Sequence, residues 1–239
     1  MMAIYVPLAI LPGLLIAWQI YRMDKYNREP WQYLLMCFAL GMVVTFPPLK
    51  LEEWATNQGF DQPDHLGYLL LTAFVFVALS EELVKFLVLM LYAYPKKVFD
   101  EPLDGIVYAI MIGMGFATLE NVLYALRFGL PTTLVRALTA VPAHAIFAVF
   151  MGYYVGLSKF NPKQSRRLKV RGFFAAVLLH GAYDLFILQE MYEPLMIFAT
   201  FTLLISGYFA WQLIRLHQAN SPFKEGEQRS LALREQEEE

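Results

Sequence analysis

The sequence has little charge, almost no cysteine, and no H-E-x-x-H motif of the kind that binds zinc in soluble metalloproteases. Charged residues make up only 17% of the 239 residues, whereas hydrophobic residues make up 58%, well above the apolar content of soluble domains. A net charge of −2, with the basic residues placed between apolar runs, argues against a nucleic-acid partner. The single cysteine, Cys37, excludes an internal disulfide and a thiolate-rich zinc site. These absences predict an integral membrane protein.

Seven apolar runs are each long enough, at about 20 residues, to cross a hydrocarbon layer of roughly 30 Å as helices. We therefore expect an all-α, polytopic helix bundle in a single membrane domain, residues 1–216, with spans at about 3–21, 31–49, 66–94, 104–127, 132–157, 171–189 and 193–216. The first run lacks the charged n-region and the cleavage site of a signal peptide, so we interpret it as a span. The polar remainder, 217–239, is expected to be a disordered tail.

The distribution of lysine and arginine predicts the orientation of these spans. Basic residues gather in the loops after the first, third and fifth spans, whereas the loop after the second span is acidic, with Glu52, Glu53, Asp61 and Asp64. Because cytoplasmic loops carry an excess of Lys and Arg, we expect the N-terminus outside and the C-terminus in the cytoplasm. The predicted location is the cell membrane, with the lipid bilayer in contact with the chain.

The third apolar run contains three charged residues, Glu81, Glu82 and Lys85. A charged side chain at the centre of a bilayer costs roughly 2.5 to 3.5 kcal/mol on insertion scales. Glu81 and Lys85 are four residues apart and share a helix face, so they can form an ion pair. One lysine cannot neutralise two acids, and this stretch is therefore the first candidate for a functional site.

Three later spans place polar side chains at a similar depth. They are Glu120 and Asn121 in the fourth span, His144 in the fifth, and His180 and Asp184 in the sixth. Each such group is costly unless it faces the bundle interior or water, so the pattern predicts one shared cavity within residues 66–190. His180 and Asp184 are one turn apart, which suits either a carboxylate that orients an imidazole or two ligands of one metal. Arg136 is interpreted as an interfacial anchor.

Two further patterns indicate packing and turns. Gly152 and Gly156 form a G-x-x-x-G pattern, which lets a neighbouring helix approach closely. Asp104, in the turn before the fourth span, is expected to cap a helix that begins at Gly105.

Taken together, these motifs resemble the PrsW-type intramembrane proteases, membrane relatives of the glutamate-dependent endopeptidases that process prenylated C-termini. The matching pieces lie in one order along residues 75–190: E-E-x-x-K at Glu81 to Lys85, D-G-I-x-Y at Asp104 to Tyr108, G-F-A-x-x-E-N at Gly115 to Asn121, His144, and H-x-x-x-D at His180 to Asp184. The prenyl endopeptidases show E-E-x-x-x-R and H-x-x-x-N instead. Lipidated substrates are therefore not expected.

The resemblance implies an endopeptidase that cleaves a single-span or membrane-anchored protein, in that family typically an anti-sigma factor whose loss releases a stress response. It also implies that Glu81 and Glu82 form the catalytic centre. No serine or cysteine nucleophile lies near a histidine in the sequence, so we predict that one of the two glutamates activates a water molecule. His144 and His180 would bind the water or the oxyanion, with Lys85, Glu120, Asn121 and Asp184 in support.

Three alternatives remain open at this point. A zinc site would use His144, His180, Glu81 and Asp184, although no cofactor is required by the glutamate mechanism. A proton-coupled transporter would need polar groups along a path across the bilayer, whereas here they gather near one level. A scaffold would use the polar cluster only to join helices. Homo-oligomerisation is not decided by the sequence.

Overall fold

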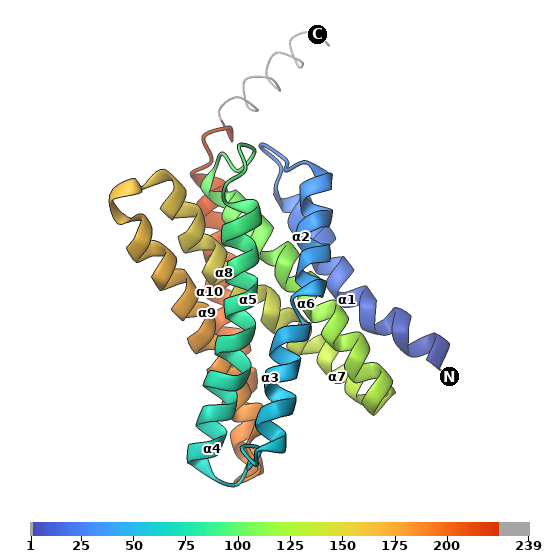
Figure 1. Cartoon of the computed structure of the whole chain (residues 1–239). Coiled ribbons are helices and arrows are strands. Elements are labelled where there is room, and N and C mark those ends of the chain that lie inside the picture. The colour runs from blue at the N-terminus through green and yellow to red at the C-terminus, as the bar shows by residue number, and fades with distance from the viewer. Residues whose placement is uncertain (1, 225–239) are drawn as a thin grey trace.

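The computed structural model describes residues 2–224, and within them every regular element is a helix (Figure 1). The elements are α1 (Met2–Met23), α2 (Trp31–Val43), α3 (Phe46–Asn57), α4 (Leu66–Leu71), η1 (Thr72–Leu79), α5 (Ser80–Val88), η2 (Leu89–Ala93), α6 (Pro102–Phe128), α7 (Leu130–Leu138), α8 (Ala140–Phe160), η3 (Pro162–Gln164), α9 (Ser165–Leu188), η4 (Glu193–Met196) and α10 (Ile197–Ala219). The predicted all-α fold is confirmed. Most of the predicted tail, residues 225–239, lies outside the described residues.

Within residues 2–224, six helices are long and apolar enough to cross a membrane, which confirms a multi-pass membrane protein. The third predicted span, which contains three charged residues, forms a further continuous helical path from Leu66 to Ala93 through α4, η1, α5 and η2. Figure 1 shows the α1–α2 and α5–α6 loops at one end of the bundle and the α3–α4 loop at the other. The basic and the acidic loops therefore lie at opposite ends, and the orientation in the membrane stays a prediction.

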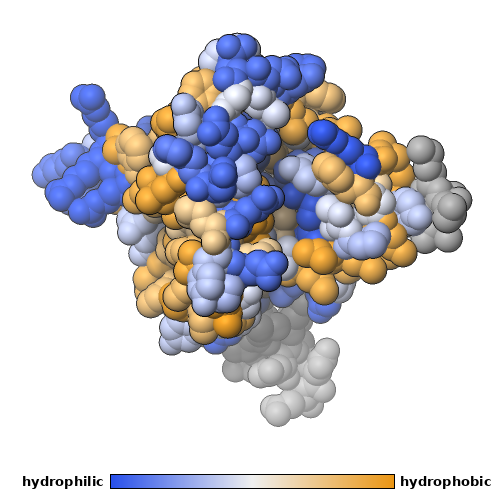
Figure 2. Space-filling view, turned by 90° about the horizontal axis from the view of Figure 1, so that it is seen from below, coloured by the Kyte–Doolittle hydropathy of each residue, from blue (hydrophilic) through white to orange (hydrophobic). Residues whose placement is uncertain are grey.

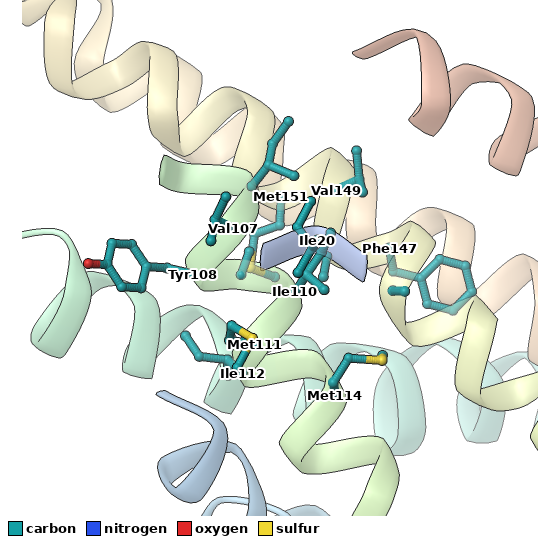
Figure 3. Packing of buried hydrophobic residues seen from close by; sticks show 14 of the residues in the cluster. Ile20, Val107, Tyr108, Ile110, Met111, Ile112, Met114, Phe147, Val149 and Met151 are labelled. Atoms are coloured by element: carbon teal, nitrogen blue, oxygen red, sulfur yellow. The ribbon is translucent and has the colours of Figure 1, made fainter. Parts of the chain in front are cut away.

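Helix α6 is the centre of the bundle. In its most apolar window, 83% of the residues are buried, compared with 22% in the windows of α1 and α10. A helix that is apolar on all sides is expected to be enclosed by other helices. Figure 3 shows this core, in which Val107, Ile110 and Met114 of α6 lie near Phe147 and Met151 of α8.

Glycines allow α6 and α8 to approach closely. A Cβ atom on Gly152 would overlap the carbonyl oxygen of Gly105, and one on Gly156 would overlap the carbonyl oxygen of Pro102. The G-x-x-x-G prediction is therefore confirmed, with the first turn of α6 as the neighbouring backbone. This contact fixes the two helices that carry Glu120 and His144.

The second predicted span ends differently from the expectation. Proline has no N–H and clashes with the preceding turn of a helix, so Pro47 and Pro48 interrupt the run and begin a new helix, α3. The chain then stays helical to Asn57, eight residues beyond the predicted end. Glu52 and Glu53, predicted to lie in a loop, are helical residues.

The fifth predicted span is also two helices. It breaks at Thr139, which has a φ of −122°, between α7 and α8. Pro142 then falls in the first turn of α8, where its missing N–H costs no intrahelical hydrogen bond. His144 consequently lies near the start of α8.

Candidate active site

The helix that carries the two adjacent glutamates changes its pitch on both sides of them. α5 is flanked by the π-helical segments η1 and η2. Ser80, at the junction with η1, donates its hydroxyl to the carbonyl oxygens of Phe76 and Val77. Wide turns of this kind frequently accompany functional sites, because they reorient the side chains that follow.

Lys85 is the hub of a buried polar network. Its Nζ donates to Glu81 Oε2 at 3.0 Å and to Glu82 Oε1 at 2.8 Å, and it lies 3.0 Å from His144 Nδ1. All four side chains are at most 5% exposed. An ammonium has three protons and no lone pair, so His144 Nδ1 must be an acceptor and the ring proton must lie on Nε2.

From His144 the network continues to α6 and α7. His144 Nε2 lies 3.0 Å from Glu120 Oε2, and the same oxygen lies 2.8 Å from Arg136 Nη2. The Arg136 guanidinium also lies over the Tyr124 ring, 3.9 Å from its centroid. The interpretation of Arg136 as an interfacial anchor is therefore wrong, because its side chain reaches inward to neutralise Glu120.

On the other side of Lys85 the network continues to α9. His180 Nδ1 lies 2.9 Å from Glu82 Oε1, and His180 Nε2 lies 3.2 Å from Asp184 Oδ2. The His180 ring stacks on Phe147, with 4.9 Å between centroids. Both nitrogens of His180 thus face carboxylates, and its orientation is fixed from two sides.

The structure brings together seven of the eight predicted site residues. Asn121 is the exception, because its amide donates to the Ala9 carbonyl oxygen of α1 at 3.0 Å. Successive residues of a helix point about 100° apart, so Asn121 cannot share the direction of Glu120. Its predicted place in the wall of the site is corrected to a contact between α6 and α1.

A cavity of about 500 Å³ reaches this network. At its inner end it is lined by Glu81, Glu120, His144, His180 and Asp184, and at its outer end by exposed residues of two loops, Asp61, Gln62 and Glu190. Figure 2 looks onto this end of the molecule and shows hydrophilic side chains near its centre. Water can therefore reach the buried carboxylates from the end that carries the acidic α3–α4 loop.

Sequence reasoning missed Glu52, which also lines the cavity. Its Oε1 atom is buried without a hydrogen-bond partner among the described residues. The neighbouring Glu53 instead has a side chain 60% exposed and pairs with Lys50 at 2.6 Å. Only the extension of the helix through α3, which places these two acids on different faces, would have distinguished them.

The residues of the network also suit a metal ion by type and spacing. One donor atom from each of Glu81, Glu82, His144 and His180 lies within 4.8 Å of the others, and such N and O donors are ligands that zinc accepts. Asp184, predicted as a ligand, is replaced in this set by Glu82. Lys85 Nζ already contacts three of the four residues, so a cation is in place at the centre of the set.

The predicted D-G-I-x-Y motif lies apart from this network, where the α1–α2 loop meets α6. Tyr108 donates to Glu29, and Asp104 Oδ2 accepts from the backbone N–H groups of Asp100 and Glu101. The helix begins at Pro102 with Glu101 as its N-cap, so the predicted start at Gly105 is wrong because Asp104 reaches back from the first turn.

Buried acids gather around this loop. Asp24 and Glu29 are at most 3% exposed, and burial raises the pKa of each to about 7. The backbone N–H of Glu29 donates to Asp24 Oδ2 at 2.9 Å and opposes the rise in the Asp24 pKa. Burial also raises the pKa of Glu101. This second cluster ties the loop to α6 and does not line the cavity.

Comparison with known proteins places this chain in a family. A family profile described as "PrsW family intramembrane metalloprotease" matches residues 29–211. The chain is 37% identical over 181 residues to Protease PrsW of Geobacillus kaustophilus, covering 76% of this chain and 78% of that one. It is 36% identical over 183 residues to Protease PrsW of Bacillus subtilis (76% and 81%), and 32% identical over 208 residues to that of Halalkalibacterium halodurans (87% and 94%). No solved structure matches the chain.

Proposed function

The chain belongs to the PrsW family of intramembrane proteases, and we propose that it hydrolyses a peptide bond of a membrane-anchored protein with a water molecule activated by Glu81. The observation that carries this proposal is the position of Glu81 at the inner end of a water-accessible cavity, where Lys85 holds its carboxylate. A general base must lie within hydrogen-bond reach of the proton that it removes. Glu81 satisfies this requirement for a water molecule in the cavity.

The contacts of the two glutamates support different roles. Glu81 lines the cavity and accepts one hydrogen bond, from Lys85. Glu82 is 1% exposed, and its Oε1 accepts a hydrogen bond from Lys85 Nζ and also contacts His180 Nδ1. We assign Glu81 as the base and Glu82 as a positioning residue that keeps Lys85 and His180 in place.

In this mechanism Glu81 takes a proton from water while the oxygen of that water attacks the scissile carbonyl carbon. The proton then passes to the leaving amine, and both peptide fragments are released. Negative charge develops on the carbonyl oxygen and needs a hydrogen-bond donor. Arg136 lines the same cavity and its Nε has no hydrogen-bond partner among the described residues, so we assign it to this oxygen in preference to the two histidines, whose nitrogens are engaged.

A zinc-dependent version of the same activity is the second candidate, because four donor atoms converge in the network. In that version Glu81, Glu82, His144 and His180 would hold the ion, which as a Lewis acid would supply a more acidic bound water. Lys85, which contacts three of these residues, weighs against it. Lys85 would have to leave these three contacts when the metal ion binds.

The substrate proposed here is a single-span or membrane-anchored protein, and the resemblance to PrsW proteases favours an anti-sigma factor. The cavity opens at the end opposite the basic loops. With the orientation predicted from Lys and Arg, the cut would fall near the outer face of the membrane.

The test is cleavage of a panel of single-span proteins by the full chain in liposomes. Glu81→Gln is expected to abolish cleavage. The matched control Glu53→Gln, which removes an exposed acid of α3, is expected to cleave like the wild type. Protection of the buried Cys37 from a fluorogenic thiol probe verifies that each variant is folded. Full activity of a folded Glu81→Gln variant would refute the assignment of the base.

A chelator separates the two candidates. Cleavage that is indifferent to the chelator supports the glutamate mechanism. Cleavage that is lost on chelation and restored by added zinc supports the metal-dependent version.

A further inference from the structure

The cavity has far more acidic than basic groups in its wall. Six carboxyl groups line it, from Glu52, Asp61, Glu81, Glu120, Asp184 and Glu190, and Arg136 is the one lysine or arginine among the lining residues. Lys85 adds a second positive charge beside Glu81. Because a low-dielectric cleft lined by charges of one sign concentrates ions of the opposite sign, the cavity favours a cationic occupant.

Three acids of this wall form no ion pair among the described residues: Asp61 and Glu190 at the rim, which are exposed to solvent, and Glu52 farther in. Glu81 contacts Lys85, Glu120 contacts Arg136, and Asp184 contacts His180. Glu52 belongs to none of the ion pairs of the described residues, and its Oε1 atom is buried without a hydrogen-bond partner there. A buried carboxylate needs a hydrogen-bonded partner of opposite charge, or it must bind a proton.

The geometry gives little support for a metal ion at Glu52. The donor atoms that converge within 4.8 Å come from Glu81, Glu82, His144 and His180, and Glu52 is not among them. A volume of about 500 Å³ is instead in the range of cavities that hold organic ligands. An extended segment of polypeptide with one long side chain fits this space better than a bare ion.

We propose that Glu52 is a specificity residue that binds a lysine or arginine side chain of the substrate close to the scissile bond. This inference rests on the proposed function, since it identifies the class of substrate for the same cavity. The basic side chain would enter from the rim formed by Asp61 and Glu190. Its charged end would reach Glu52 while the backbone beside it lies against Glu81.

The experiment measures peptide binding separately from peptide cleavage. The probes are fluorescent single-span peptides that differ in one residue next to the span, which is Lys, Met or Glu, and this residue is moved through successive positions. Dissociation constants are measured by fluorescence anisotropy in nanodiscs of zwitterionic phosphatidylcholine, so that the Lys peptide is not attracted to anionic lipid. Cleavage of the same peptides is followed on gels.

The wild type is expected to bind the best Lys peptide on the order of tenfold more tightly than the Met peptide, as for one hydrogen-bonded charge pair. Glu52→Gln should remove this preference, and Glu52→Lys should reverse it in favour of the Glu peptide. The matched control Glu53→Gln, whose side chain is exposed on the same helix, should keep the wild-type preference. Should Glu52→Lys fail to fold, Glu52→Gln decides alone.

Equal affinity of the wild type for all three peptides, or a preference that persists in Glu52→Gln, overturns this inference. Cleavage without any charge preference would refute it while leaving the proposed function intact. Charge-dependent binding without cleavage of any peptide would refute the proposed function and leave the role of Glu52 standing.

Discussion

Replacing Lys85 by methionine tests whether one cation holds the buried network together. Methionine keeps the length and the apolar stem of the side chain but removes the charge and all three contacts of Nζ, at 2.8 to 3.0 Å. Glu82 would still face His180. Glu81 would lose its closest cation in a place where the side chain is 4% exposed.

The expected loss follows from that burial. Removing one partner of a buried ion pair costs about 3–5 kcal/mol in the free energy of unfolding, because an uncompensated charge remains. For a domain of this size each kcal/mol shifts the melting temperature by about 2–4 °C, which gives a decrease of about 6–20 °C. Adding Glu81→Gln removes the uncompensated charge and should recover most of the lost stability.

The assay is thermal unfolding in detergent, monitored through the fluorescence that a thiol probe gains when it reacts with Cys37. Cys37 is the single cysteine of the chain and is fully buried, so its fluorescence reports loss of the native fold. Lys50→Met is the matched control, because the Lys50–Glu53 pair is exposed to solvent and such pairs contribute little. The reasoning would be refuted if Lys85→Met melted like Lys50→Met, or if the double variant were no more stable than Lys85→Met.

Three further predictions concern other parts of the molecule. The pKa values of Asp24 and Glu29 are raised to about 7, so near neutral pH the folded state holds protons that the unfolded state has released. The melting temperature should therefore fall as the pH rises from about 4 to about 7. The double variant Asp24→Asn, Glu29→Gln should show a flatter dependence of melting temperature on pH. Gly152→Leu would force its side chain into the backbone of α6 and should lower the free energy of unfolding by at least about 3 kcal/mol; wild-type stability in chemical denaturation would contradict the close contact. Arg136→Gln should reduce kcat by about 10²-fold with a small change in KM, whereas Arg127→Gln, exposed on α6, should not; equal effects would argue against a role at the carbonyl oxygen.

The helical runs of this fold were predictable from the sequence because apolar length alone specifies a span. The breaks within them were not, because a proline pair ends one helix and begins another without a change in hydropathy. Pro47 and Pro48 therefore looked like the end of a span, whereas the chain continues as α3. The break at Thr139, which separates α7 from α8, was missed for the same reason, because the hydropathy does not change there.

The candidate site was predictable to the extent that charge inside a membrane is rare. Glu81, Lys85, His144 and His180 each stood out against an apolar background, and they do converge. Arg136 and Glu52 lie near the ends of apolar runs, where a charge is ordinary and only the folded geometry shows that it turns inward. The prediction for Asn121 was wrong for a different reason: it is adjacent to Glu120 in the chain, but its side chain points in another direction.

The position of the cavity rim at one end of the bundle also means that the chemistry of the site faces one compartment. The rim is formed by the α3–α4 loop and by Glu190, so protons, salt and small molecules on that side would reach Glu81. On the opposite side, the packed core of α6 and α8 would separate Glu81 from the solution. A permanently charged inhibitor would consequently act from one face of a sealed vesicle and be inert from the other.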